Sequence, residues 1–396
     1  MNAMTARKEH VLNLTIDRHY LIETLAHLIR INSINPTLVP GGPGEAEIAA
    51  YVADLLRSLE LDVATHEPMP GRVSTVGILK GSGGGRSLMF NAHTDTVGIE
   101  GMPEPFSAAI RDGKMFGRGA YDMKGSLAAC LAAAKALVDA RVALKGDLLV
   151  AAVADEEYAS IGTTDLIVRS RVDGAIVTEP TELGICLAHK GFLWLEVETT
   201  GWAAHGSRFD AGIDANMRMG RFLAELDKLE HELRARERHP LVGPPSLHAA
   251  TIHGGTGLST YAASCKLQIE RRTIPGETEA QVVGEIEEIV TRLAAADPTF
   301  KASVRCFFVR HPFEVLPEAT IVKVLRQAAT KVLGKEPAYT GQTPWMDAAL
   351  LSAAGVETVV MGPRGGGAHS AEEWVDLQSL VDLAHILAQT ALDYCQ

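Results

Sequence analysis

Histidine and acidic residues follow four short apolar segments of this sequence, each at the point where the segment ends. The segments have the length and composition of buried strands. Because ligands of open α/β sheets bind beyond the carboxyl ends of the strands, we expect these polar side chains to gather at one edge of a sheet. The pairs are Leu88–Ala92 with His93 and Asp95, Leu148–Ala154 with Asp155, Glu156 and Glu157, Ala175–Thr178 with Glu179, and Thr358–Met361, which leads through a Gly-rich turn to His369.

A fifth candidate ligand, Asp122, lies in the glycine-bearing loop Gly117–Asp122, ahead of a helix near Ser126. This many carboxylates in one place repel one another unless a cation lies among them. The segments contain too few Lys and Arg residues to supply that charge, so a divalent metal ion is the natural partner, and two ions account for five ligands better than one. Imidazole and carboxylate ligands together suit Zn²⁺, with Co²⁺ and Mn²⁺ as substitutes.

Each of these residues also has a structural explanation when it is taken alone. A histidine after a strand is often a hydrogen-bonded core residue, an aspartate before a helix is often its N-cap, and three acids together are usually a solvated loop. Explaining all of them in this way requires several coincidences in one fold, so a metal centre is the better hypothesis. The residues concerned are His93, Asp95, Asp122, the acids at 155–157 and His369.

The adjacent acids Glu156 and Glu157 suggest a division of roles. Neighbouring residues of an extended segment point to opposite sides, so both cannot easily bind one ion. One of them then binds metal, and the other faces a bound water as general base. Asp95 lies two residues beyond His93, where its carboxylate is placed to accept the second ring N–H of that histidine.

The elements that must position these residues alternate between helix and strand in the first half of the chain and again after Pro317. Apolar residues recur at helical spacing in His19–Ile31, Ala46–Leu59 and Thr320–Leu333, and short apolar strands lie between such helices. This order is typical of an α/β sheet that is covered by helices on both faces.

The middle of the chain has a different order, β-α-β-β-α-β, which matches the ferredoxin-like unit. The simplest interpretation is one α/β domain, residues 1–190 and 313–396, with a smaller α+β domain inserted at 191–312. The elements expected in the insertion are the strands Phe192–Thr200, His248–His253, Ala263–Thr273 and Lys301–Val309 and the helices Ile213–Arg236 and Thr278–Ala296.

Length and composition restrict the class of protein. At about 150 residues per domain, 396 residues suggest two or three domains. A net charge of −12 argues against nucleic acid or an anionic membrane surface as partner. Five scattered cysteines exclude a Cys-x-x-Cys zinc site and a disulfide framework, and fit a reducing compartment. The most apolar stretch, Leu127–Leu144, contains Lys135, Asp139 and Arg141, which indicates an amphipathic helix. With no signal-peptide core near the N-terminus, we expect a soluble cytoplasmic protein.

The motifs NAHTDTV, GRGAYDMKG, ADEEYAS, VTEPT and GGGAHSAEEW occur in this order, and with them the sequence resembles a family of di-zinc metallopeptidases. That family includes acetylornithine deacetylase, succinyl-diaminopimelate desuccinylase, carboxypeptidase G and aminoacylase. The resemblance covers essentially the whole chain and implies a zinc-peptidase-like catalytic domain with a mixed sheet between helices. It implies that Asp122 bridges two metal ions, that Glu156 is the general base, and that Asp95 supports His93. The remaining ligands of one or other ion would be His93, Glu157, Glu179 and His369.

The inserted domain resembles the lid of this family, which is also its dimerisation domain, so the resemblance implies a homodimer. The segment WAAHGS at 202–207 resembles one whose histidine reaches the active site of the neighbouring subunit, where His205 would stabilise the oxyanion. The segment ERRTIPGE at 270–277 resembles the family's Asp-x-Arg-x-x-Pro-Gly motif. Arg272 then stands where an arginine holds the substrate's α-carboxylate, a bidentate task that suits its guanidinium.

One position departs from the family: Ser259 stands where the family often has an asparagine that contacts substrate. Either this change alters the substrate, or a neighbour such as Tyr261 makes the contact instead. Glu179 is more usual in the desuccinylase and carboxypeptidase branches, whereas several aminopeptidase branches have Asp there, and the segment TPWMDAAL at 343–350 resembles the deacetylase and desuccinylase group. We therefore predict hydrolysis of an N-acyl-L-amino acid by a metal-bridged hydroxide, with Glu156 as general base. The alternatives are a dipeptidase or carboxypeptidase with the same two-metal site, and a family member that binds metal without catalysis. The acyl group stays open.

Overall fold

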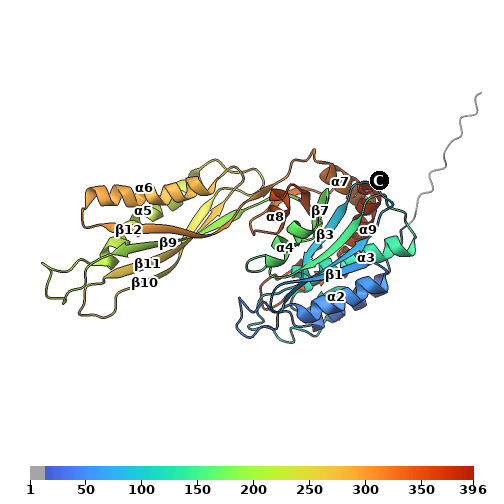
Figure 1. Ribbon diagram of the computed structural model, residues 1–396, viewed down its shortest axis with the longest axis horizontal. Coiled ribbons are helices and arrows are strands. Elements are labelled where there is room, and N and C mark those ends of the chain that lie inside the picture. Colours follow the sequence, from blue (N-terminus) through green and yellow to red (C-terminus); the bar gives the residue numbers. More distant parts are fainter. Residues whose placement is uncertain (1–13) are drawn as a thin grey trace, which may run out of the picture. The chain divides into compact units, whose positions relative to one another are not determined.

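The computed structural model describes residues 14–396 (Figure 1) and divides into two compact units. The expected insertion, residues 191–312, falls within the second unit. That unit also takes in residues 340–349, which the sequence reasoning assigned to the catalytic domain. Among the described residues, the first unit consists of the chain up to Cys186, Val315–Tyr339 and Leu350–Gln396, and the second consists of Leu187–Glu314 and Thr340–Ala349.

A mixed sheet confirms the expected α/β class. Its strand order is β1-β2-β6-β3-β7-β15-β8-β13, with β14 beside β8. The central strands β6, β3, β7 and β15 are parallel to one another, whereas the strands on either side pair antiparallel. The strands are β1 (Asp62–Met69), β2 (Arg72–Leu79), β3 (Leu88–His93), β6 (Leu148–Val153), β7 (Gly174–Val177), β8 (Ile185–His189), β13 (Phe313–Glu314), β14 (Tyr339–Gln342) and β15 (Glu357–Val360).

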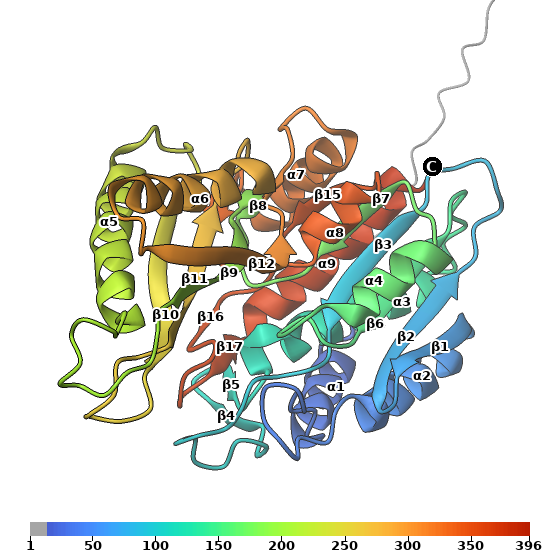
Figure 2. The same ribbon diagram turned by 60° about the vertical axis from the view of Figure 1, so that its left-hand side comes forward.

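Helices lie on both faces of this sheet (Figure 2). Successive residues of β2 show the two faces: Thr75 donates a hydrogen bond to the main chain of α2, and Ser74 lies against Gly162 of α4, where a Cβ would come within 2.6 Å of its hydroxyl. The helices of this part are α1 (Arg18–Arg30), α2 (Ala46–Ser58), α3 (Gly125–Asp139), α4 (Ile161–Arg169), α7 (Thr320–Leu333), α8 (Ala348–Ala353) and α9 (Leu377–Tyr394).

Helix α3 differs from the amphipathic helix expected at Leu127–Leu144. It ends at Asp139, and nearly every residue from Gly125 to Leu137 is buried, because α1, α9 and the sheet pack around it. Its small side chains, mostly alanines, allow that close packing on several sides. Charged residues are confined to its last two turns and to the loop beyond.

A small second sheet in the first unit carries the loop of His369. Its strand order is β16-β17-β5-β4, and each strand has only two or three residues, too short to be recognised from an apolar pattern. The strands are β4 (Ala109–Arg111), β5 (Lys114–Phe116), β16 (Gly365–Gly366) and β17 (Trp374–Asp376).

The second unit contains a four-stranded antiparallel sheet in the order β10-β11-β9-β12, with α5 and α6 on one face (Figure 1). Alternate residues of β9 face these helices, so that Leu195 packs in one core with Phe222 of α5 and Ile286 of α6. The chain order is the predicted β-α-β-β-α-β. The elements are β9 (Gly191–Thr200), α5 (Ala215–Ala235), β10 (Ser246–Gly254), β11 (Ser264–Thr273), α6 (Glu279–Ala296) and β12 (Lys301–Arg310).

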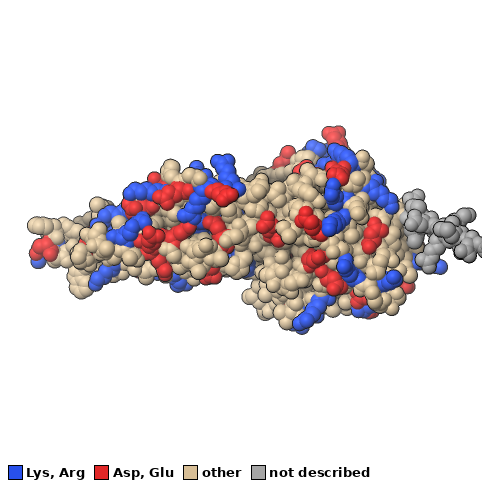
Figure 3. Space-filling view, turned by 90° about the horizontal axis from the view of Figure 1, so that it is seen from above, with Lys and Arg blue, Asp and Glu red and all other residues tan. Residues whose placement is uncertain are grey.

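The distribution of surface charge and the character of the helices complete this description. Basic and acidic side chains are interspersed over the face shown in Figure 3, which carries no extended patch of one sign. Within residues 14–396, no helix has both the length and the apolar character needed to cross a membrane.

Candidate metal centre

The five predicted metal ligands lie together in the first unit. Strands β6, β3 and β7 are adjacent and parallel, so their carboxyl ends meet at one edge of the sheet. His93 is the last residue of β3, Glu179 follows β7, and Glu157 lies in the turn after β6. Asp122 comes from the segment η1 (Ala120–Lys124) ahead of α3, where its backbone angles are not helical, and His369 comes from the loop between β16 and β17.

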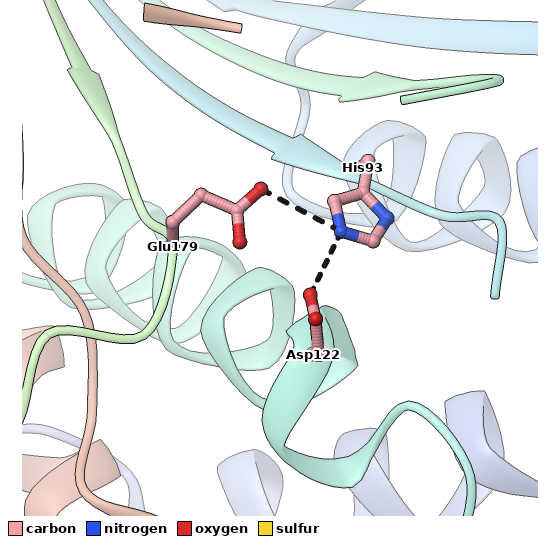
Figure 4. A group of neighbouring side chains, drawn as sticks. All are labelled: His93, Asp122 and Glu179. Atoms are coloured by element: carbon pink, nitrogen blue, oxygen red, sulfur yellow. Dashed lines mark hydrogen bonds and ion pairs between the residues drawn. The ribbon is translucent and has the colours of Figure 1, made fainter. Parts of the chain in front are cut away.

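The first group of ligand atoms surrounds the ring of His93 (Figure 4). Its Nε2 lies 3.0 Å from Oδ1 of Asp122 and 3.6 Å from Oε1 of Glu179. His93 is 1% exposed and Glu179 is 6% exposed, so this group lies inside the protein. One nitrogen and two carboxylate oxygens within 4.8 Å of one another form a set that could hold a metal ion.

The second group shares Asp122 with the first. Nε2 of His369 lies 3.3 Å from Oδ2 of Asp122 and 3.0 Å from Oε2 of Glu157. Asp122 therefore turns one carboxylate oxygen to each group, the arrangement expected of a ligand that bridges two ions. About half of the His369 side chain is exposed, so this second group opens toward solvent.

Charge in the two groups is balanced by the histidines. Burial lowers the pKa of His93, but the charges of Glu179 and Asp122 outweigh it and hold this pKa well above its usual value. Hydrogen bonds to Asp122 and Glu157 raise the pKa of His369 to about 10. Burial raises the pKa of Asp122, but both histidines outweigh it and hold this pKa far below its usual range. The carboxylates thus favour positive charge here, which a divalent metal ion would supply in place of the protons when both imidazoles bind it in their neutral form.

Asp95 supports the site differently from the expectation. The Nδ1 atom of His93 lies 2.9 Å from the main-chain oxygen of Asp95, closer than the carboxylate at 3.6 Å. The carboxylate accepts hydrogen bonds from the backbone N–H groups of Glu156, at 3.0 Å, and Glu157, at 3.2 Å. Asp95 therefore fixes the ring of His93 through its main-chain oxygen, and it fixes the backbone at Glu156 and Glu157 through its side chain.

The residues after β6 form a turn, so the reasoning from an extended segment does not hold. Asp155 has a φ of 69°, in the left-handed region that aspartate tolerates better than most residues, and the chain turns there. Glu157 belongs to the second ligand group, whereas Glu156 belongs to neither of the groups found among the described residues. The turn, rather than strand alternation, gives the two glutamates different positions.

Two buried residues beside the ligands were not singled out from the sequence. Glu373, 1% exposed, accepts hydrogen bonds from the backbone N–H groups of Gly119, Tyr121 and Asp122, and pairs with Arg118 at 2.6 Å. Arg118 also donates to the main-chain oxygen at position 370, next to His369. The pair thus ties the loop of Asp122 to the loop of His369. Both residues lie inside the family motifs, but their types alone do not reveal this contact.

His205, Ser259 and Arg272 belong to the second unit, and their relation to the metal ligands stays a prediction. His205 is exposed, its Nδ1 lies 2.8 Å from the hydroxyl of Ser207, and its strand bridge to Thr260 places it beside the loop of Ser259. The side chain of Arg272 is 32% exposed, and its Nε donates to Glu270 at 2.7 Å.

The chain is similar to known proteins in sequence and in fold. The sequence resembles acetylornithine deacetylase from Myxococcus xanthus, with 30% identity over 94% of this chain and 97% of the relative. N-formyl-4-amino-5-aminomethyl-2-methylpyrimidine deformylase from Bacillus subtilis (strain 168) is 28% identical over 94% of this chain and 95% of its own length. The fold is similar to that of the YXEP protein of Bacillus subtilis, a dinuclear metal-binding peptidase of family M20, with a TM-score of 0.74, 17% identity, and coverage of 95% of this chain and 98% of that one. The sequence profile of peptidase family M20/M25/M40 matches residues 89–393, so the chain belongs to this family.

Proposed function

We propose that this hydrolase of family M20 is a metal-dependent amidohydrolase that cleaves the amide bond of an N-acyl-L-amino acid, as acetylornithine deacetylase or succinyl-diaminopimelate desuccinylase does. The observation that carries the proposal is the position of Asp122, which presents one carboxylate oxygen to each of two groups of potential ligands. The family match and the full-length similarity to acetylornithine deacetylase support the substrate class.

Two metal ions would be held by the two groups, with Asp122 in both. Imidazole and carboxylate donors suit zinc best, with cobalt or manganese as substitutes. When bound, such ions supply Lewis acidity that polarises an amide carbonyl and lowers the pKa of water. The chain's own part is to place His93 and Glu179 in a buried group and His369 and Glu157 in a more open one, where a substrate can enter.

Glu156 is the proposed general base. It would take a proton from the attacking water and pass it to the nitrogen of the leaving amine, a transfer that contributes about 10²–10⁴-fold in rate. Its backbone N–H donates to the carboxylate of Asp95, so its main chain is held by a residue that lies two positions beyond the end of β3. Glu156 precedes Glu157, a member of the second ligand group, and a fixed backbone favours a defined position of its carboxylate.

The second unit is proposed as the lid and dimerisation domain. Arg272 would bind the α-carboxylate of the substrate, since its bond to Glu270 orients a partly exposed guanidinium. His205 of a partner chain would stabilise the oxyanion, and its exposure supports that role. Ser259 lies beside it and would adjust the fit of the substrate. The expected homodimer and the cytoplasmic location belong to the same proposal.

A panel of N-acetyl, N-succinyl and N-formyl amino acids and simple dipeptides, each with zinc, cobalt or manganese, tests the proposal. Turnover of one acylated class that is abolished by a chelator and restored by metal is the expected result. Turnover of dipeptides alone would replace the proposal by the dipeptidase or carboxypeptidase alternative. Two bound metal ions without turnover of any compound would favour a binding protein.

A further inference from the structure

Asn35 lies behind the turn that carries Glu156 and Glu157, outside every motif discussed so far. It is completely buried, and its backbone N–H donates to the main-chain oxygen of Thr96 at 2.9 Å. Its side-chain amide donates one hydrogen bond to Asp95, at 2.8 Å, and one to Asp155, at 2.9 Å.

The orientation of this amide is determined by its surroundings. The Oδ1 atom of Asn35 accepts a hydrogen bond from the backbone N–H of Thr37 at 2.9 Å, and the Nδ2 atom faces two carboxylates. The reversed orientation would place the amide oxygen against both carboxylates and the amine against an N–H donor. Asn35 therefore uses both of its donors and one acceptor, which few other residue types could reproduce here.

Both carboxylates that Asn35 contacts hold the turn that carries Glu156 and Glu157. Asp95 accepts the backbone N–H groups of Glu156 and Glu157, and Asp155 is the first residue of the turn. The main-chain oxygen of Asp155 also accepts the N–H of Ala159 at 3.1 Å, which closes the turn. Asn35 thus links Asp95, which binds the backbone N–H groups of both glutamates, to Asp155, which begins their turn.

The same contacts have an electrostatic consequence. Asp95 and Asp155 are 0% and 2% exposed, and each is a carboxylate within hydrogen-bond distance of one amide nitrogen. Arg72 pairs with Asp155 at 2.7 Å, but it also binds Glu45 at 2.6 Å and 2.7 Å. The guanidinium of Arg72 therefore pairs with the carboxylates of Asp155 and Glu45. The neutral amide of Asn35 binds Asp155 and also the third carboxylate, Asp95.

We propose that Asn35 is a positioning residue: through Asp95 and Asp155 it fixes the turn that aims Glu156 at the reacting water. The inference rests on the proposed function for its kinetic consequence, but the support of the turn itself is independent of the reaction. A displacement of about 1 Å in such a group can reduce the rate about 10²-fold.

The matched pair of variants is Asn35→Asp and Asn32→Asp. Both exchange an amide for a carboxylate in the same segment. The Oδ1 of Asn32 only accepts a hydrogen bond from the N–H of Ile34 at 3.1 Å, which a carboxylate also accepts. Asn35→Asp removes both donors and adds a third acid next to Asp95 and Asp155. Asn35→Ala, which removes the donors without adding charge, serves if the first variant does not fold.

With zinc at saturation, we expect kcat of the Asn35 variants to fall about 10–100-fold while KM and the bound metal per chain stay unchanged. Asn32→Asp should keep the kcat of the unmodified chain. The proposal is overturned if the Asn35 variants keep the kcat of Asn32→Asp, or if the bound metal per chain falls in proportion to their rate, because metal loss would then explain the lower activity.

Amide hydrogen exchange separates this inference from the proposed function. In Asn35→Asp or Asn35→Ala, the backbone N–H groups of Glu156 and Glu157 should exchange faster than in Asn32→Asp, whether or not a substrate has been found. Unchanged exchange in this turn would refute the positioning role even if the N-acyl amino acid activity is established. Faster exchange in a chain without amidohydrolase activity would retain the role and refute only the function.

Discussion

Replacing Glu373 by glutamine should lower the stability of the chain and weaken metal binding, although no metal ligand is replaced. Its Oε2 accepts from Arg118 at 2.6 Å and from the N–H of Gly119 at 3.1 Å, and its Oε1 accepts from the N–H groups of Tyr121 at 2.9 Å and Asp122 at 3.0 Å. Glutamine has one carbonyl oxygen, so it can serve only one of these two pairs of donors.

The size of the effect follows from the burial of the pair. The side chains of Arg118 and Glu373 are 3% and 0% exposed, and Glu373→Gln leaves the guanidinium without its carboxylate. Breaking a buried ion pair by removing one partner costs about 3–5 kcal/mol of stability. Because the N–H of Asp122 is one of the four donors, we also expect weaker metal binding, by about 10–100-fold, as is usual when a residue that supports a ligand is changed.

Urea unfolding and metal competition with a chromophoric chelator measure the two effects. The neighbour Glu372 is exposed, so Glu372→Gln removes the same charge from the same loop and should change stability by less than about 0.5 kcal/mol. If Glu373→Gln matches Glu372→Gln in both stability and metal affinity, the reasoning that this carboxylate holds the Asp122 loop is refuted.

Three further predictions test other parts of the account. Glu156→Gln should retain the bound metal and lose about 10²–10⁴-fold in kcat; turnover equal to that of the unmodified chain would rule out the general-base role. Mixing Glu156→Gln chains with His205→Ala chains should restore part of the activity, because one site of each heterodimer keeps both groups; verified heterodimers without activity would argue against a role in the partner's site. Burial lowers the pKa of His189 to about 4, so the unfolded chain binds a proton that the folded chain does not between pH 4 and 6.5, and stability falls as pH falls through this range. His189→Gln should remove up to about 3 kcal/mol of this pH dependence in unfolding measurements, and an identical pH profile would contradict it.

The sequence predicted those parts of the site that depend on strand ends. His93 and Glu179 directly follow apolar runs, and parallel strands bring such positions to one edge of a sheet, so their meeting could be inferred. The ferredoxin-like order of the second unit was also predictable, because its strands alternate and its helices have a clear apolar stripe. Helix α3 was misjudged as amphipathic because alanine-rich sequences do not reveal how many sides will be covered.

The supporting contacts were not predictable in the same way. Whether a carboxylate binds a metal, caps backbone N–H groups as Asp95 and Glu373 do, or pairs with an arginine depends on residues far away in the chain. Asn35 is separated from Asp155 by 120 positions, and nothing in its local sequence indicates that it meets two aspartates. The turn at Asp155 was missed because the apolar run before it suggested a continuing extended segment.

A zinc titration of the metal-free chain, followed by the hydrolysis of the best N-acyl amino acid, tests the central claim most directly. The two ligand groups that share Asp122 predict that activity rises until two equivalents of zinc per chain are bound. They also predict that Asp122→Asn never reaches the activity of the unmodified chain. Full activity with no metal bound, or an Asp122→Asn chain with the activity of the unmodified protein, would contradict the account.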